Sequence, residues 1–158
     1  MKKTFILPLL VAAMSVNSMA QTIVPTDRIK TETICDTDKM PSFPGGEQAL
    51  ADFLIKNIQY PLKAVETGVQ GRIVMSFAID KDGSITDIAA KDCVISSYDK
   101  KFFDKLSAGE QEKLKKECML AFAKEGARII RLMPNWEPGE RKGEKVKALY
   151  RLPINFKQ

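Results

Sequence analysis

The stretch that decides the fold is Arg72-Ile73-Val74-Met75-Ser76-Phe77-Ala78-Ile79-Asp80, which is followed at once by Lys81-Asp82-Gly83. From Ile73 to Ile79 every odd-numbered residue is apolar, and apart from Val74 the even-numbered residues are polar or small. This period of two predicts a half-buried strand over Arg72–Asp80. Asp82-Gly83 is a hairpin turn signal, so a returning strand is predicted over Ser84–Lys91.

A second stretch with the same period lies near the end of the chain, at Lys145–Phe156. Its inward-facing side chains are predicted to be those of Val146, Ala148, Tyr150, Leu152, Ile154 and Phe156. Pro153 falls on the outward-facing set and cannot donate a hydrogen bond to a neighbouring strand. The stretch is therefore predicted to form an edge strand of the sheet and not a central one.

Two short helices are predicted ahead of the first strand. Glu47–Asn57 carries apolar side chains at spacing i, i+3, i+4 and i+8, which is typical of an amphipathic helix with one buried stripe. Pro61 stops this helix, because the residue before a proline avoids helical dihedrals. The same proline can open a second helix, Leu62–Thr67, which Gly68 closes in a left-handed cap.

A longer helix is predicted between the hairpin and the last strand. Ser107 and Glu110 fit a capping box, from which the helix is expected to run to Met133. Gly126 lies in its apolar stripe and would allow close approach to the sheet. The resulting order of elements predicts an α+β fold, in which helices pack on one face of a small three-stranded antiparallel sheet.

The composition argues against most enzyme chemistry. The chain has 158 residues, of which 44% are hydrophobic and 28% are charged, a balance typical of one globular domain. It contains no histidine, which excludes Ser-His and Cys-His catalysis and His-ligated zinc or haem. We therefore assign no catalytic residue, metal, cofactor or small-molecule substrate. The basic residues are dispersed among carboxylates, which does not favour nucleic acid as a partner.

The hairpin turn also resembles part of an EF-hand calcium loop, through Asp80 and Asp82. Aligning Gly83 with the glycine of that loop places Ala78 and Ala89 at its first and last positions, where calcium needs carboxylates. Calcium binding is therefore rejected in favour of a simple turn.

The first twenty residues have the pattern of an export signal. Lys2 and Lys3 form a positive region, Phe5–Val16 is an apolar run, and Ser18-x-Ala20 supplies small residues at −3 and −1. The apolar run is shorter than the roughly 20 residues that span a bilayer. Cleavage after Ala20 and a periplasmic location are expected, with an uncleaved inner-membrane anchor as the alternative.

A series of spaced motifs gives the chain a family resemblance. In order they are Phe43-Pro44-Gly45-Gly46, Asn57-Ile58-Gln59-Tyr60-Pro61, Gly68-x-x-Gly71, Asp82-Gly83, Trp136-x-Pro138-Gly139 and Tyr150-Arg151-Leu152-Pro153. Together they closely resemble the C-terminal domain of TonB energy transducers, in the form found in the Bacteroidetes. The resemblance covers about residues 40–158. Residues 1–20 would then be the signal peptide and 21–39 a flexible N-terminal arm.

The resemblance implies a partner and a mode of docking. Domains of that family bind TonB-dependent outer-membrane receptors, whose peptide segment adds as an extra strand to an exposed sheet edge. The implied partner-binding residues are Lys145, Val146, Lys147, Leu149 and Arg151 on the final strand, with Gln59, Tyr60 and Pro61 as a second contact region. The alternatives are that the lysines only guard an idle edge, or that the edge joins two copies in a homodimer.

The chain departs from the family pattern in two ways. The membrane helix and Pro-rich linker of a full transducer are not recognisable here, and an arm of twenty residues extends only about 70 Å. The chain alone is therefore expected not to transmit force. The segment 92–118 is longer than the usual connection and is expected to add an inserted helical segment. The alternative function is a non-transducing periplasmic protein, structural or regulatory, that keeps the fold.

The family topology also implies a disulfide between Cys93 and Cys118. Cys93 would lie just past the second strand, near which the early turns of the following helix would pack. Two separate thiols, or pairing with Cys35 of the arm, are the alternatives.

Overall fold

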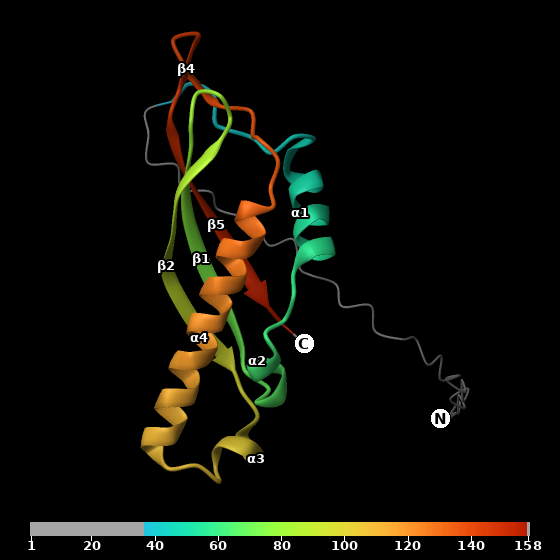
Figure 1. The fold of residues 1–158 in the computed structure, drawn as a ribbon, viewed down its shortest axis with the longest axis vertical. Coiled ribbons are helices and arrows are strands. Elements are labelled where there is room, and N and C mark those ends of the chain that lie inside the picture. The colour runs from blue at the N-terminus through green and yellow to red at the C-terminus, as the bar shows by residue number, and fades with distance from the viewer. Residues whose placement is uncertain (1–36, 158) are drawn as a thin grey trace, which may run out of the picture.

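A computed structural model describes residues 37–157 of the chain. The predicted signal peptide and residues 21–36 of the predicted arm lie outside the described residues. The elements are α1 (Gly46–Asn57), α2 (Leu62–Glu66), β1 (Gln70–Ile79), β2 (Ile85–Ser97), α3 (Lys100–Phe103), α4 (Ala108–Arg131), β3 (Gly139–Arg141), β4 (Glu144–Val146) and β5 (Ala148–Phe156). Figure 1 shows an elongated molecule with the β3–β4 hairpin at one end and α3 at the other. No helix among these residues is both long and apolar enough to cross a bilayer.

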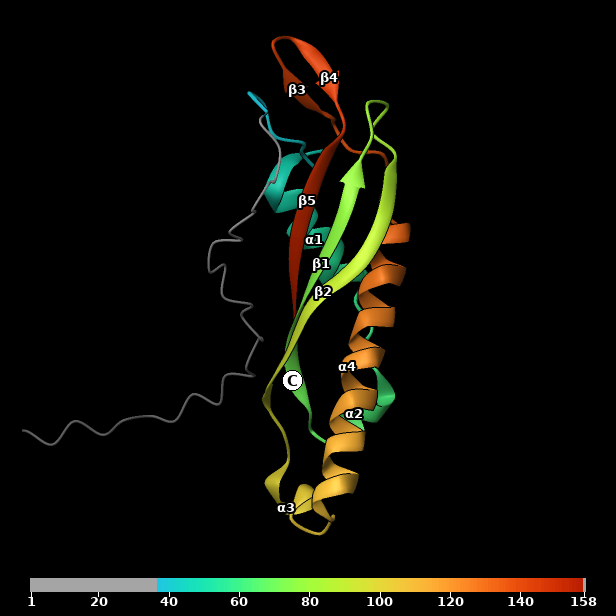
Figure 2. The same ribbon diagram turned by 90° about the vertical axis from the view of Figure 1, so that its left-hand side faces the viewer.

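The main sheet has the strand order β2-β1-β5, and both pairs are antiparallel. In Figures 1 and 2 the helices α1, α2 and α4 all lie on one side of it. The predicted α+β class and three-stranded antiparallel sheet are therefore confirmed. Gly126 brings α4 close to β1 as expected, since a Cβ there would lie only 2.9 Å from the Met75 sulfur.

The predicted inward-facing sets form the core, except for Val146, which is half-buried on β4. On β1 the side chains of Ile73, Met75, Phe77 and Ile79 are buried, as are those of Ala148, Tyr150, Leu152, Ile154 and Phe156 on β5. Trp136 joins the two strands through edge contacts with Phe77 and Tyr150, at centroid distances of 5.5 and 4.6 Å. Ser76 and Ala78 are buried as well, although they lie on the opposite face of β1. Both are small, and on β5 they pair opposite Arg151 and Leu149.

The predicted helices are present with small shifts at their ends. Pro61 precedes the first turn of α2, and Gly68 adopts the predicted left-handed conformation with φ of 61°. Ser107 and Glu110 form the complete capping box at the start of α4. This helix begins where the sequence predicts because the box satisfies backbone N–H groups that have no partner within the helix.

The predicted strand Lys145–Phe156 is divided in two. Glu144–Val146 pairs with β3 in a separate two-stranded sheet, and β5 pairs with β1. The division follows from the turn at Lys142 and Gly143, both of which have positive φ. Such a two-residue turn folds β4 back on β3. The alternation of apolar and polar residues continues from β4 into β5, so it does not reveal that the two strands pair with different partners.

The structure does not contain the expected disulfide, because Cys93 and Cys118 are both free thiols. The returning strand was predicted to end at Lys91 but continues to Ser97. Cys93 therefore lies inside β2, opposite Ile73, and not at the exit of the strand. The sulfur of Cys118 lies 3.8 Å from the Thr67 hydroxyl, beside the end of α2.

Candidate functional site

The candidate binding site is the outer side of β5, which is an edge strand of the three-stranded sheet formed by the described residues. Its pairing with β1 is regular from Ala148 to Phe156, with no register shift. Pro153 pairs opposite Val74 and has no N–H to donate to β1. Position 153 must therefore be one whose backbone groups face away from β1.

The orientation of Pro153 fixes that of its neighbours. In an antiparallel ladder, residues alternate between positions that bond the partner strand and positions whose backbone groups face the other way. Leu149 and Arg151 share the parity of Pro153, so their N–H and C=O groups are directed to the outer side of the sheet. Both belong to the predicted partner-binding set, and the Leu149 side chain is 36% exposed. The proline itself interrupts the row of outward donors.

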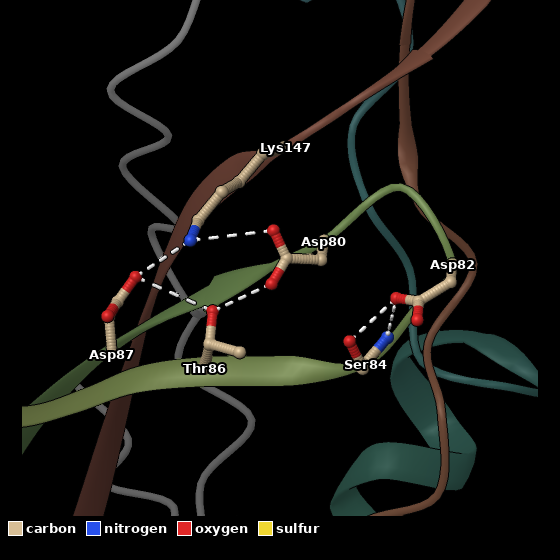
Figure 3. Close-up of polar contacts among 6 residues, drawn as sticks. All are labelled: Asp80, Asp82, Ser84, Thr86, Asp87 and Lys147. Carbon is tan, nitrogen blue, oxygen red and sulfur yellow. Dashed lines mark hydrogen bonds and ion pairs between the residues drawn. The ribbon is translucent and has the colours of Figure 1, made fainter.

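Lys147 lies between β4 and β5 and bridges the end of the sheet. Its ammonium is 2.8 Å from the Asp87 carboxylate and 3.4 Å from that of Asp80 (Figure 3). Asp87 sits in a bulge of β2 with φ of 54°, a conformation that aspartate tolerates better than most residues. The hydrogen bond from Lys147 holds the pKa of the Asp87 carboxyl below its ordinary value. This predicted contact residue therefore ties β5 to β2 across the end of β1.

The hairpin turn beside this bridge is held by its own side chains. One Asp82 carboxylate oxygen accepts from the Ser84 hydroxyl at 2.6 Å and from the Ser84 N–H at 2.9 Å (Figure 3). These bonds lower the pKa of the Asp82 carboxyl. Among the residues described, no group of three or more cysteines and carboxylates is placed to hold a metal ion.

Lys145 and Val146 lie apart from the edge of the main sheet. Both belong to β4, where Lys145 pairs opposite Glu140 and Val146 opposite Gly139. Lys145 is exposed and Val146 is half-buried. The structure therefore groups Leu149 and Arg151 on β5. It places Lys145 and Val146 on the neighbouring β3–β4 hairpin.

The second predicted contact region, Gln59–Pro61, lies at the far end of β5. The Tyr60 ring makes edge contacts with Phe122 and Phe156 at 6.1 and 5.9 Å, and its hydroxyl donates to the Val69 carbonyl at 2.7 Å. Leu149 and Phe156 are separated by roughly 23 Å at 3.3 Å per residue. The two predicted regions therefore lie along the same strand but are not brought together.

A partly buried ion pair on α4 fixes the segment that contains Gln59. The Glu125 carboxylate accepts from the Gln59 N–H at 2.7 Å and from Arg128 at 2.6 and 2.8 Å. Arg128 also donates to the Asn57 carbonyl at 2.7 Å. Burial alone would raise the pKa of the Glu125 carboxyl, but these hydrogen bonds hold it below its ordinary value.

The sequence analysis did not single out Glu125 or Arg128. The available signal was an acid and a base three residues apart, next to Gly126 in the apolar stripe of a helix. Such pairs are also common on exposed helix faces. Only the packing of α4 against the Asn57–Gln59 segment distinguishes this pair from a surface one.

Neither described cysteine has the surroundings of a reactive thiol. Burial raises the pKa of both the Cys93 and the Cys118 thiol. A nucleophilic cysteine needs the opposite shift, toward thiolate. The two side chains therefore contribute apolar packing.

The described residues form an α+β domain built around a small antiparallel sheet, with β5 at one edge. Residues 56–108, from the end of α1 to the start of α4, match the model of a family described as Gram-negative bacterial TonB protein C-terminal. This match supports a relationship to the TonB C-terminal domain family over about a third of the chain. Comparison with curated proteins and with solved structures finds no match.

Proposed function

We propose that this domain binds extended peptide segments of outer-membrane receptors, which it adds as a strand to the outer side of β5. The observation that carries the proposal is the outward direction of the Leu149 backbone groups on β5, an edge strand of the sheet formed by residues 37–157. A peptide strand that hydrogen-bonds to these groups gains affinity from its main chain, as in other cases of strand addition. The match of residues 56–108 to the TonB C-terminal family supports a place in TonB-dependent energy transduction and transport, with no reaction catalysed by the domain.

The proposed location is the periplasm, where the inner side of outer-membrane receptors is accessible. The bridge between Lys147, Asp80 and Asp87 supports the proposal because it stiffens the end of the sheet next to Leu149. A rigid edge loses little conformational freedom when a peptide docks. Pro153 has no N–H to offer, so the uninterrupted row of outward donors that we propose as the docking region lies in the first half of β5.

The experiment is photocrosslinking in living cells from a reactive residue at position 149. A matched control carries the same residue at Leu120, which is 58% exposed on α4. Outer-membrane receptors should be recovered from position 149 and not from position 120. Recovery of only a second copy of the chain would indicate a homodimer through the edge. Recovery of neither would favour a non-transducing protein that keeps the fold.

A further inference from the structure

A hollow lies beside the candidate edge, on the helical side of the sheet. It has a volume of about 260 Å³. Its walls come from the segment before α1, from α1 and from β5, and they are Met40, Pro41, Ser42, Phe43, Glu47, Leu50 and Tyr150. Small-molecule sites usually have roughly 300–1,000 Å³, so this hollow lies below that range but has room for one peptide side chain.

The position of Tyr150 links the hollow to the docking edge. Tyr150 lies between Leu149 and Arg151, and its side chain faces the helices. Side chains of paired residues on neighbouring strands lie on the same face of a sheet. A peptide residue that pairs with Tyr150 would therefore direct its own side chain to the helical side, toward the hollow.

The walls are held in place before any peptide arrives. Ser42 exchanges backbone hydrogen bonds of 3.0 and 2.8 Å with Glu137, and its hydroxyl donates to the same glutamate at 3.0 Å. Phe43 packs edge-on against Trp136 at 5.7 Å. Met40 is 41% exposed at the rim, where its flexible thioether can adapt to an incoming group.

We propose that this hollow is a specificity pocket, which receives one apolar side chain of the peptide strand docked on β5. The inference rests on the proposed function and names the chemistry that the peptide must carry. Most of the lining side chains are apolar, with Ser42 and Glu47 as the exceptions, and they favour a branched aliphatic or methionine side chain opposite Tyr150. Strand addition takes its affinity from the main chain, and pockets of this kind decide which peptides are accepted.

The test begins with a library of random nine-residue peptides, selected on the purified chain. The selected peptides should share an aliphatic residue or methionine at one position, and exchange of that residue for serine should weaken binding at least tenfold. Met40→Trp fills the hollow and should weaken the same peptide at least tenfold. The matched control, Leu120→Trp, introduces the same side chain on α4 and should leave binding unchanged.

The outcomes separate this inference from the proposed function. Peptides that bind with no preference at any position, and that tolerate Met40→Trp, would overturn the pocket and leave strand addition intact. A preference for lysine or arginine that Glu47→Gln removes would also overturn it. A dimer of the parent chain that Met40→Trp dissociates would assign the pocket to a second copy. Failure to select any peptide would instead overturn the proposed function, and the pocket with it.

Discussion

Gly83 shows how a single residue joins the hairpin turn to the last part of the chain. Its φ is 85°, and its carbonyl accepts a hydrogen bond of 2.8 Å from the Trp136 N–H. A Cβ at this position would lie 2.1 Å from the Trp136 carbonyl oxygen. The turn therefore requires glycine both for its dihedral angle and for the close approach of another backbone.

Gly83→Ala should lower the free energy of unfolding by more than about 2 kcal/mol, because the cost of the left-handed conformation is added to the cost of the clash with Trp136. Gly143→Ala is the matched control. Gly143 has a φ of 81° but nothing within 4 Å of its added Cβ, so only the conformational cost of about 1–2 kcal/mol applies. Urea unfolding of both variants checks this, and equal losses would show that the contact with Trp136 is unimportant.

Glu125 makes stability depend on pH. Its pKa is lowered on folding from an ordinary value of 4.5, so its stabilisation is present above that pH and is lost as the pH falls through the folded-state pKa. Glu125→Gln should cost about 1–3 kcal/mol at pH 7, since it weakens the bonds to Arg128 and Gln59. The difference between variant and parent should shrink below pH 4.5. Urea unfolding across this range measures it, and a constant difference would contradict the assignment.

At the scale of the element, β5 has two sides with separate roles. Even-numbered residues bond β1 and fill the core, whereas odd-numbered residues direct their backbone groups outward. Leu149→Pro should therefore remove an outward donor without breaking the ladder to β1. Peptide binding should fall below detection while circular dichroism stays that of the parent. Leu149→Thr keeps the donor and should bind within a few-fold of the parent, so equal loss in both variants would point to the side chain.

At the scale of the whole molecule, the positions of Cys93 on β2 and of Cys118 on α4 decide whether the two thiols can form a disulfide. We expect both Cys93 and Cys118 to remain reduced in a Cys35→Ser chain purified without reductant. Alkylation in denaturant should add two labels, and in the folded chain the half-buried Cys93 should react before the buried Cys118. A mass two hydrogens lower, with no label added, would show that the disulfide forms after all.

The proposed periplasmic location makes a separate prediction for the intact chain. Protein from a periplasmic extract should have a mass that corresponds to removal of residues 1–20, because the signal pattern ends at Ala20. Mass spectrometry of the fractionated cell tests this. Full-length chain found only in the inner-membrane fraction would favour an uncleaved anchor.

The sequence alone determined the strand β1, its turn, the capping box of α4 and the edge position of the final strand. Each depends on local physics, such as a period of two, a residue free to take positive φ, or a proline without a donor. The family resemblance depends on the same local features. The choice of Leu149 and Arg151 as contact residues came from that resemblance, and the parity set by Pro153 now gives it a physical basis.

Only the tertiary structure decided the features that depend on which segments meet. The alternation over Lys145–Phe156 is continuous, yet Val146 and Ala148 pair with different strands. Cys93 failed as a disulfide partner because pairing with β1 carries β2 on to Ser97. The bond from Gln59 to Glu125 and the hollow beside Tyr150 join segments far apart in the chain. Such contacts depend on packing and strand register, which the periodicity of a short stretch of sequence does not reveal.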